Sequence, residues 1–173
     1  MIYDKFIRLV ETHAEVLTGT WIKEVKNNPS TSGYKHLSDE TLGNRVYDVY
    51  KRLGEWILLE ENTLKKTAEH YMRLGRDRAA EGIKASEVIY ALILTRVVLW
   101  RYIISQGIIS STLELHQALE FYQKINNFFD KAAYFVLVGF ESLKPEEQAK
   151  LKKEDFIEKA VESVTHWFIK DFK

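Results

Sequence analysis

Residues 84–105 read KASEVIYALILTRVVLWRYIIS, and this stretch decides the fold. At about 100° per residue in an α-helix, five polar side chains fall within an arc of about 120°; they are Lys84, Glu87, Thr95, Arg101 and Ser105. Nearly all the other residues around this helix are apolar. A helix with so wide an apolar surface packs on several sides, so we expect it to be the central helix of the domain.

Arg96 is the exception in the apolar part, about 100° beyond the nearest edge of the polar arc. An arginine in that place is expected to pair with a carboxylate, to line a cavity or to lie at a subunit interface. Trp100, four residues later, can cover its guanidinium group. We expect Arg96 to be largely buried in an ion pair, so that Arg96→Ala costs about 3–5 kcal/mol. A role for Arg96 and Trp100 in binding a ligand is the alternative.

Working outward from this stretch, helical periodicity covers most of the chain. Ser38 and Ser111 are good N-caps, and Gly82 followed by Ile83 is the pattern of a Schellman turn. The segment 27–33, which reads NNPSTSG, is the clearest loop. The sequence therefore predicts an all-α fold, a single bundle of five main helices over 2–26, 38–59, 62–81, 84–105 and 111–141, with a tail helix over 156–172.

We divide the chain into a sensor-like helical domain over 1–143 and a helical tail or linker over 144–173. The tail carries a wide apolar patch that must pack on the bundle or on another chain; its residues are Ile157, Val161, Val164, Trp167 and Phe168. We favour a symmetric homodimer through this tail, because two-fold pairs are the commonest oligomers. Packing of the tail on its own bundle is the alternative.

Composition excludes several classes of protein. The 173 residues include 25 Lys and Arg, 25 Asp and Glu, and no cysteine. A net charge of zero argues against a nucleic-acid binder, and the lack of cysteine excludes disulfides and thiolate metal sites. The apolar stretch 88–104 is short for a membrane span and contains two arginines, and we find no signal peptide. We expect a cytoplasmic protein that binds neither membranes nor nucleic acid.

No motif for metal, cofactor or nucleotide binding is found. The five histidines lack the Glu-x-x-His and His-Glu-x-x-His spacings of metal sites. Glycine-rich phosphate loops and the Gly-x-Ser-x-Gly motif are also lacking. We therefore assign no catalytic residue, no metal ligand and no cofactor.

The stretch Leu74–Ile83, LGRDRAAEGI, leads directly into the central helix. It resembles the N-terminal helical domain of the RsbRD type of RsbT co-antagonist proteins, in which an Arg-Ala-x-x-Gly turn joins two helices and a Leu-Trp pair lies near the end of the second. The matching residues here are Arg78, Ala79, Gly82, Leu99 and Trp100. The resemblance covers about residues 6–141.

The resemblance implies a bacterial signal-input domain that is not an enzyme, acts as a dimer, and binds a small molecule or an output-domain partner. The candidate binding residues are Arg96, Trp100, Arg76 and Arg78. Arg76 and Arg78 also have a simpler interpretation, as cations that complement the dipole at a helix C-terminus. Two other functions remain open: a helical-bundle enzyme that acts on an anionic small molecule, and a purely structural dimerisation module.

Overall fold

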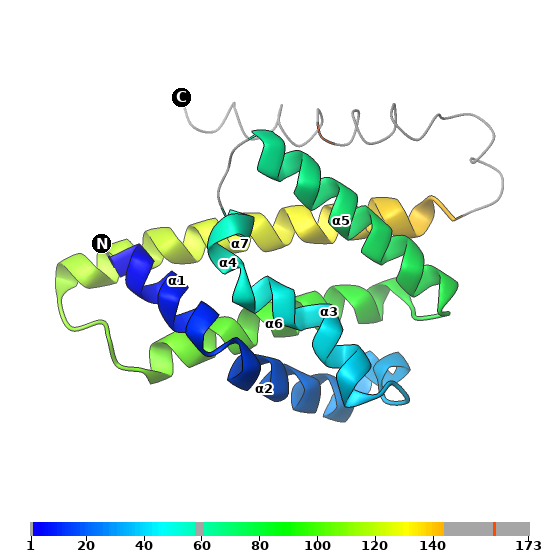
Figure 1. Ribbon diagram of the computed structural model, residues 1–173, viewed down its shortest axis with the longest axis horizontal. Helices are drawn as coiled ribbons and strands as arrows, with labels where there is room; N and C mark the ends of the chain where they lie inside the picture. The colour runs from blue at the N-terminus through cyan, green and yellow to red at the C-terminus, as the bar shows by residue number, and fades with distance from the viewer. Residues whose placement is uncertain (1, 58–60, 144–160, 162–173) are drawn as a thin grey trace.

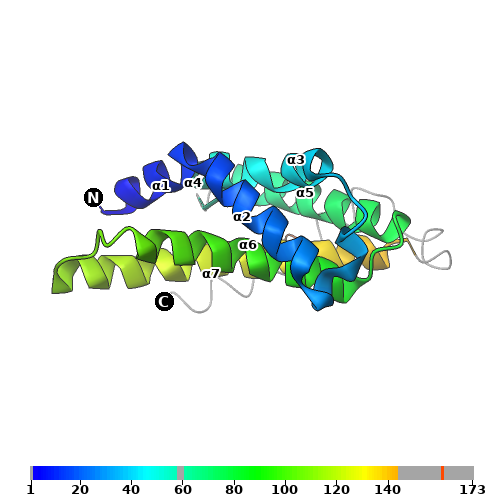
Figure 2. The ribbon, with the colours of Figure 1, turned by 90° about the horizontal axis from the view of Figure 1, so that it is seen from below.

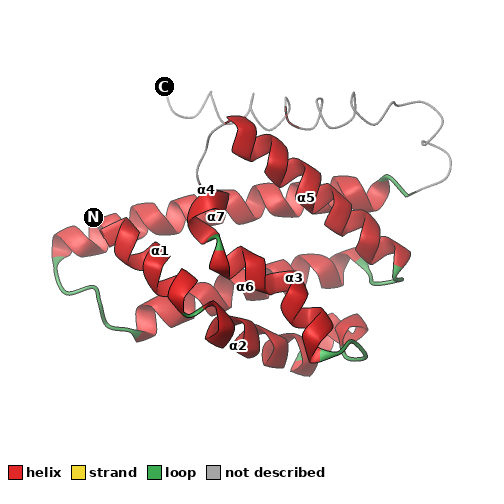
Figure 3. Cartoon of the chain, in the orientation of Figure 1, coloured by secondary structure: helices red, strands yellow, loops and turns green. Residues whose placement is uncertain are grey.

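The computed structural model describes residues 2–57, 61–143 and 161, and these residues form an all-α fold, as predicted (Figures 1 and 3). In chain order the elements are α1 (Ile2–Thr12), α2 (Ala14–Asn27), the 3-10 helix η1 (Pro29–Tyr34), α3 (Asp39–Lys51), α4 (Leu53–Ile57), α5 (Glu61–Ala80), α6 (Ala85–Ser105) and α7 (Thr112–Glu141). The predicted tail helix lies outside the described residues except for Val161.

Two of the predicted helices are each divided in two. The predicted helix 2–26 breaks at His13, and the predicted helix 38–59 breaks at Arg52, where φ is −121° and ψ is 32°. No proline marks either break, and the buried apolar side chains continue on both sides, from Phe6 and Val10 to Leu17. Periodicity alone therefore predicted one helix in each place, because a kink preserves the apolar stripe.

The predicted cap residues form the predicted contacts. Ser38 Oγ accepts a hydrogen bond of 3.1 Å from the Thr41 backbone N–H, and Ser111 Oγ accepts one of 3.2 Å from the Glu114 backbone N–H. Gly82 has a φ of 76°, which favours glycine, and the backbone N–H of Ile83 donates to the carbonyl oxygen of Arg78 at 3.0 Å. These are the contacts of a Schellman turn.

The helices form two layers. Figure 2 shows α6 and α7 side by side along one side of the molecule, with α1, α3 and α5 on the other. Helix α6 contacts α1, α2, η1, α5 and α7, so it packs on several sides, as predicted, but one side of it is exposed. By length and composition α6 is also the one described helix that could cross a membrane, a test that the core helix of a soluble protein passes as well.

Helices α5 and α7 cross with their backbones in contact. A Cβ atom on Gly75 would lie 2.0 Å from the carbonyl oxygen of Val136, and one on Gly139 would lie 2.0 Å from the carbonyl oxygen of Met72. No side chain fits at either position, so this crossing requires two glycines. Around it the core includes fully buried Tyr71 and Phe135.

Candidate functional site

Helix α6 turns two residues of its predicted polar arc toward the protein, while Lys84, Arg101 and Ser105 of that arc are exposed. Glu87 and Thr95 are buried, although both belong to that arc. The Glu87 carboxylate accepts hydrogen bonds from Ser32 Oγ at 2.9 Å, from the Gly33 backbone N–H at 2.8 Å and from the Lys84 backbone N–H at 3.1 Å. These bonds, that from Gly33 above all, hold the pKa of Glu87 below its usual value.

Two buried side chains attach α6 to its neighbours on the same inner side. Trp21 Nε1 of α2 donates to the carbonyl oxygen of Ala91 at 3.0 Å, and the Tyr50 hydroxyl of α3 donates to the carbonyl oxygen of Thr95 at 3.1 Å. The rotation of α6 about its axis is therefore fixed from α2, η1 and α3.

As a result, apolar side chains of α6 face outward. Ile93, Val97 and Ile104 are 38%, 36% and 50% exposed. Helix α7 adds a second exposed apolar stripe at helical spacing, made of Leu115, Leu119, Tyr122 and Leu137. Together with Arg96, Trp100 and Asp130 we call these residues the α6–α7 face. Among the helices that the structure describes, none covers its outer side (Figure 2).

Contacts between side chains join the two stripes into one surface. Arg96 Nη1 lies 3.4 Å from Asp130 Oδ1, and the rings of Trp100 and Tyr122 lie 4.9 Å apart between centroids. In both pairs one residue belongs to α6 and the other to α7. The α6–α7 face is therefore continuous across the helix pair.

Arg96 is paired as predicted but is not largely buried. Its side chain is 27% exposed and that of Asp130 is 68% exposed. The angular argument placed Arg96 correctly away from the polar arc, but it assumed that the side of α6 opposite this arc lies in the core. Since Glu87 and Thr95 of this arc pack inward, the opposite side of α6 lies at the surface, and Arg96 is at its edge.

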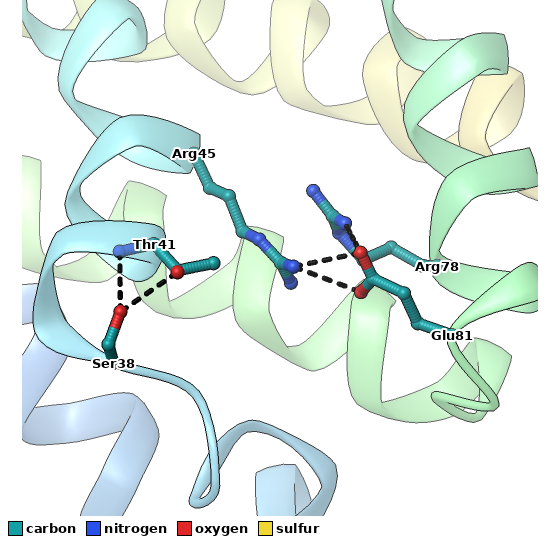
Figure 4. A network of polar contacts seen from close by, with 5 residues as sticks. All are labelled: Ser38, Thr41, Arg45, Arg78 and Glu81. Carbon is teal, nitrogen blue, oxygen red and sulfur yellow. Dashed lines mark hydrogen bonds and ion pairs between the residues drawn. The ribbon is translucent and has the colours of Figure 1, made fainter.

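A second cluster lies on the inner side of α6, where α3 and α5 meet (Figure 4). Arg45 Nη2 of α3 donates to both carboxylate oxygens of Glu81, at 2.9 and 3.0 Å, and Arg78 Nη1 of α5 donates to Glu81 Oε1 at 2.8 Å. The side chains of Arg45 and Arg78 are only 13% and 10% exposed, and that of Glu81 is 38% exposed. We call these three residues the arginine cluster.

The arginine cluster borders a small cavity of about 30 Å³, measured as the volume open to the centres of water-sized spheres. Side chains of α2, η1, α3, α5 and α6 line it, most of them apolar, together with Arg45, Arg78, Tyr34 and Tyr71. Burial raises the pKa of Tyr34 to about 12, although the two arginines beside it act in the opposite direction. Burial, and then the charge of Arg78, lower the pKa of Arg45.

The four predicted binding residues therefore lie in different places. Arg96 and Trp100 belong to the α6–α7 face, and Arg78 lines the cavity. Arg76 is half-buried and lies two residues before Arg78, which places it about 200° around α5.

Sequence reasoning missed Arg45, Glu81 and Tyr34. The one signal for Arg45 was its position beside the buried stripe of Leu42, Val46 and Val49. Its partner Glu81 lies 36 residues later, and nothing in the local pattern links the two.

Of the five tail residues proposed as an interface, only Val161 lies among the described residues. It is half-buried and packs against the hydrophobic core. Ile157, Val164, Trp167 and Phe168 lie outside the described residues. Within the described part of the chain, no three His, Asp or Glu side chains are grouped so that they could hold a metal ion.

Comparison with known proteins gives one match. A family model described as the RsbT co-antagonist protein rsbRD N-terminal domain matches residues 16–142, which include the arginine cluster and the whole α6–α7 face. No match was found among curated proteins or among solved structures. The chain therefore belongs to the RsbRD N-terminal domain family and is a regulatory domain of bacterial stress signalling.

Proposed function

We propose that this domain is a non-catalytic, cytoplasmic signal-input domain that acts as a homodimer, with the α6–α7 face as the contact between two copies. The observation that carries the proposal is the outward apolar surface of α6, the same helix whose buried polar groups fix it in the core. An apolar surface of this extent on a soluble domain is typical of a protein–protein interface.

The size of the α6–α7 face suits a second copy of the chain. Helix α6 has 21 residues and is therefore about 30 Å long. Two neighbouring helices are about 20 Å wide, so the face has an area on the order of 600 Å². A standard interface buries about 800 Å² of each partner. Two α-helical pairs that meet through such faces form a four-helix arrangement, a common solution for apolar stripes of this spacing.

The charges of the face also suit self-association. It carries one arginine and one aspartate, which already pair with each other at 3.4 Å. A second copy related by two-fold symmetry brings the same pair, so like charges are balanced by opposite ones. Tyr122 and Trp100 supply the aromatic area that is enriched at the centre of interfaces.

The chemistry of the cavity supports a non-catalytic role. The titratable groups that line it are two arginines and two tyrosines, and burial raises the pKa of both Tyr34 and Tyr71. None of the described residues that line the cavity is a histidine or a carboxylic acid, the groups that most often serve general acid–base catalysis. An enzyme that acts on a small anion is therefore the less supported alternative.

Sedimentation equilibrium on the full chain tests the homodimer. We expect a dimer at tens of micromolar, the range in which pairs of moderate affinity assemble. Val97→Glu and Leu119→Glu, which place carboxylates in the α6–α7 face, should give monomers with unchanged helical circular dichroism. Val16→Glu is the matched control, because Val16 is 55% exposed on α2, outside the face. A parent chain that stays monomeric at these concentrations contradicts the proposal.

The same measurement separates this interface from the tail. If Val97→Glu and Leu119→Glu leave the dimer intact while Trp167→Glu dissociates it, the tail over 144–173 holds the two copies together. If Trp167→Glu remains a dimer while Val97→Glu and Leu119→Glu dissociate, the α6–α7 face is sufficient.

A further inference from the structure

The cavity bordered by the arginine cluster lies on the side of α6 away from the α6–α7 face. Its α6 lining includes Val88, Ala91 and Thr95. By helical geometry these positions are centred about 170° around the helix from Ile93 and Val97. The cavity is therefore a separate feature of the domain, formed inside one copy of the chain.

The arginine cluster holds more positive than negative charge. Two nearly buried guanidinium groups share a single carboxylate, and both donate to the same oxygen, Glu81 Oε1. Removing a cation from water without a counter-ion is costly, so buried cations are normally paired one to one. One further negative charge would balance this cluster.

Two buried polar atoms that belong to residues lining the cavity have no hydrogen-bond partner among the described residues. One is Nη1 of Arg45 and the other is the hydroxyl oxygen of Tyr71. Most buried polar groups in proteins have partners, so unpaired ones beside a cavity call for an explanation. Arg45 uses its Nη2 to hold Glu81, while its Nη1 remains a charged donor without a hydrogen-bond partner among the described residues.

The volume of the cavity limits the size of an anion that can lie inside it. About 10–15 Å³ measured in this way holds one water molecule, so a cavity of about 30 Å³ holds about two. A ligand that lies wholly inside this volume is therefore much smaller than a nucleotide. A carboxylate with one or two further carbon atoms fits, with its short apolar part against Val46, Val88 and Leu92. Planar guanidinium groups also match the geometry of a carboxylate.

We propose that this cavity is a binding site for a small monocarboxylate of two or three carbons, with Arg45 and Arg78 as its cationic ligands. The proposal identifies the chemical class of ligand that the signal-input domain would bind. The site does not depend on the dimer, since every residue of it comes from one chain.

Titration of the ¹⁵N-labelled full chain with sodium acetate and sodium propionate tests the site at constant ionic strength. We expect the indole N–H signal of Trp21, which lines the cavity, to shift and saturate; Trp21→Phe assigns that signal. Sodium chloride and neutral propionamide are the controls. Equal saturation with chloride would indicate an adventitious ion only, and equal saturation with propionamide would show that the arginines are not used. Either result, or no shift at tens of millimolar, overturns the proposal.

Substitutions identify the ligands. Arg45→Met and Arg78→Met should weaken propionate binding by about tenfold or more, because each removes a charged donor. Arg76→Met is the matched control on the same helix and should bind as the parent does. Glu81→Gln should tighten binding by about tenfold, because it removes the competing carboxylate from the cluster. An unfolded variant would lose propionate binding, so unfolding cannot produce the gain in affinity expected for Glu81→Gln. This variant therefore tests the site even if the arginine variants fail to fold.

If Glu81→Gln binds propionate no better than the parent, the arginine cluster is not the anion site. The titration is repeated on Val97→Glu, which should bind propionate as the parent does. Propionate binding by Val97→Glu would show that the cavity binds its ligand whether or not the homodimer forms.

Discussion

The indole nitrogen of Trp21 donates a hydrogen bond of 3.0 Å to the carbonyl oxygen of Ala91, a residue 70 positions later in the chain. The Trp21 ring also lies edge-on to Tyr34 of η1, with 6.4 Å between the ring centroids. One side chain thus connects α2, η1 and α6. Trp21 also lines the cavity, so its contact with α6 helps to set the size of the cavity.

Replacing Trp21 by phenylalanine should destabilise the domain by about 2–3 kcal/mol, since it removes a buried hydrogen bond and part of a buried ring. Chemical denaturation monitored by circular dichroism measures the change in the free energy of unfolding. Trp100→Phe is the control, because Trp100 is only half-buried, and it should cost less than about 1 kcal/mol. Equal losses for the two variants would show that the contact between Trp21 and α6 is not important for stability.

The crossing of α5 and α7 predicts two opposite effects of adding one methyl group. Gly75→Ala and Gly139→Ala place Cβ 2.0 Å from a carbonyl oxygen, so the helices must separate, at a cost of about 3 kcal/mol. Gly19→Ala, in α2, meets no atom within 4 Å and should instead stabilise by about 0.5–1 kcal/mol through helix propensity. Melting temperatures of the three variants check the prediction. A Gly75→Ala variant as stable as the parent would mean that the two backbones are farther apart.

Arg96→Ala should cost less than about 1 kcal/mol in the monomer, because its partner Asp130 is 68% exposed and water replaces the lost cation. This is well below the 3–5 kcal/mol expected for a buried pair. Urea denaturation at low protein concentration, where any dimer is dissociated, gives the value. A loss of several kcal/mol there would restore the interpretation of Arg96 as a buried ionic residue.

Glu87 predicts a dependence of stability on acid pH. Its pKa is lower in the folded protein than the ordinary value of 4.5, so the carboxylate stabilises the fold fully above that pH. This contribution is lost as the pH falls below 4.5 and through the lowered pKa of the folded state. Glu87→Gln should therefore be less stable than the parent at pH 7, and the difference should shrink toward pH 3. Denaturation curves at several pH values measure it, and a constant difference would contradict the linkage.

Much of the fold could be predicted from local patterns. Ser38, Ser111 and Gly82 act on neighbouring backbone groups, so their roles can be predicted from the residues next to them in the sequence. The rotation of α6 could not be predicted in the same way. Glu87 is buried because Ser32 and Gly33, more than 50 residues earlier, offer it hydrogen bonds. A Cβ on Gly33 would lie 2.8 Å from this carboxylate, so the need for glycine at this position also depends on a residue far away in the sequence.

The candidate site shows the same limit. Arg78 was found because it belongs to a recognisable turn, whereas Arg45 was not, since only the fold brings α3 beside α5. The sequence predicted the helix over 111–141 from its periodicity, but periodicity does not distinguish an apolar stripe that faces the core from one that faces a second molecule.

The contact of Gly75 and Gly139 with the opposite backbone also has a mechanical consequence. No side chain stands between the two helices there, so a rotation of α7 against α5 would have this crossing as its pivot. Gly139 lies near one end of α7, and Thr112 begins the other end, about 40 Å away at 1.5 Å per residue. A rotation of only about 3° at this pivot would move that far end by about 2 Å over this length. In such a rotation Leu115 and Leu119, near the far end of α7, would travel much farther than Leu137.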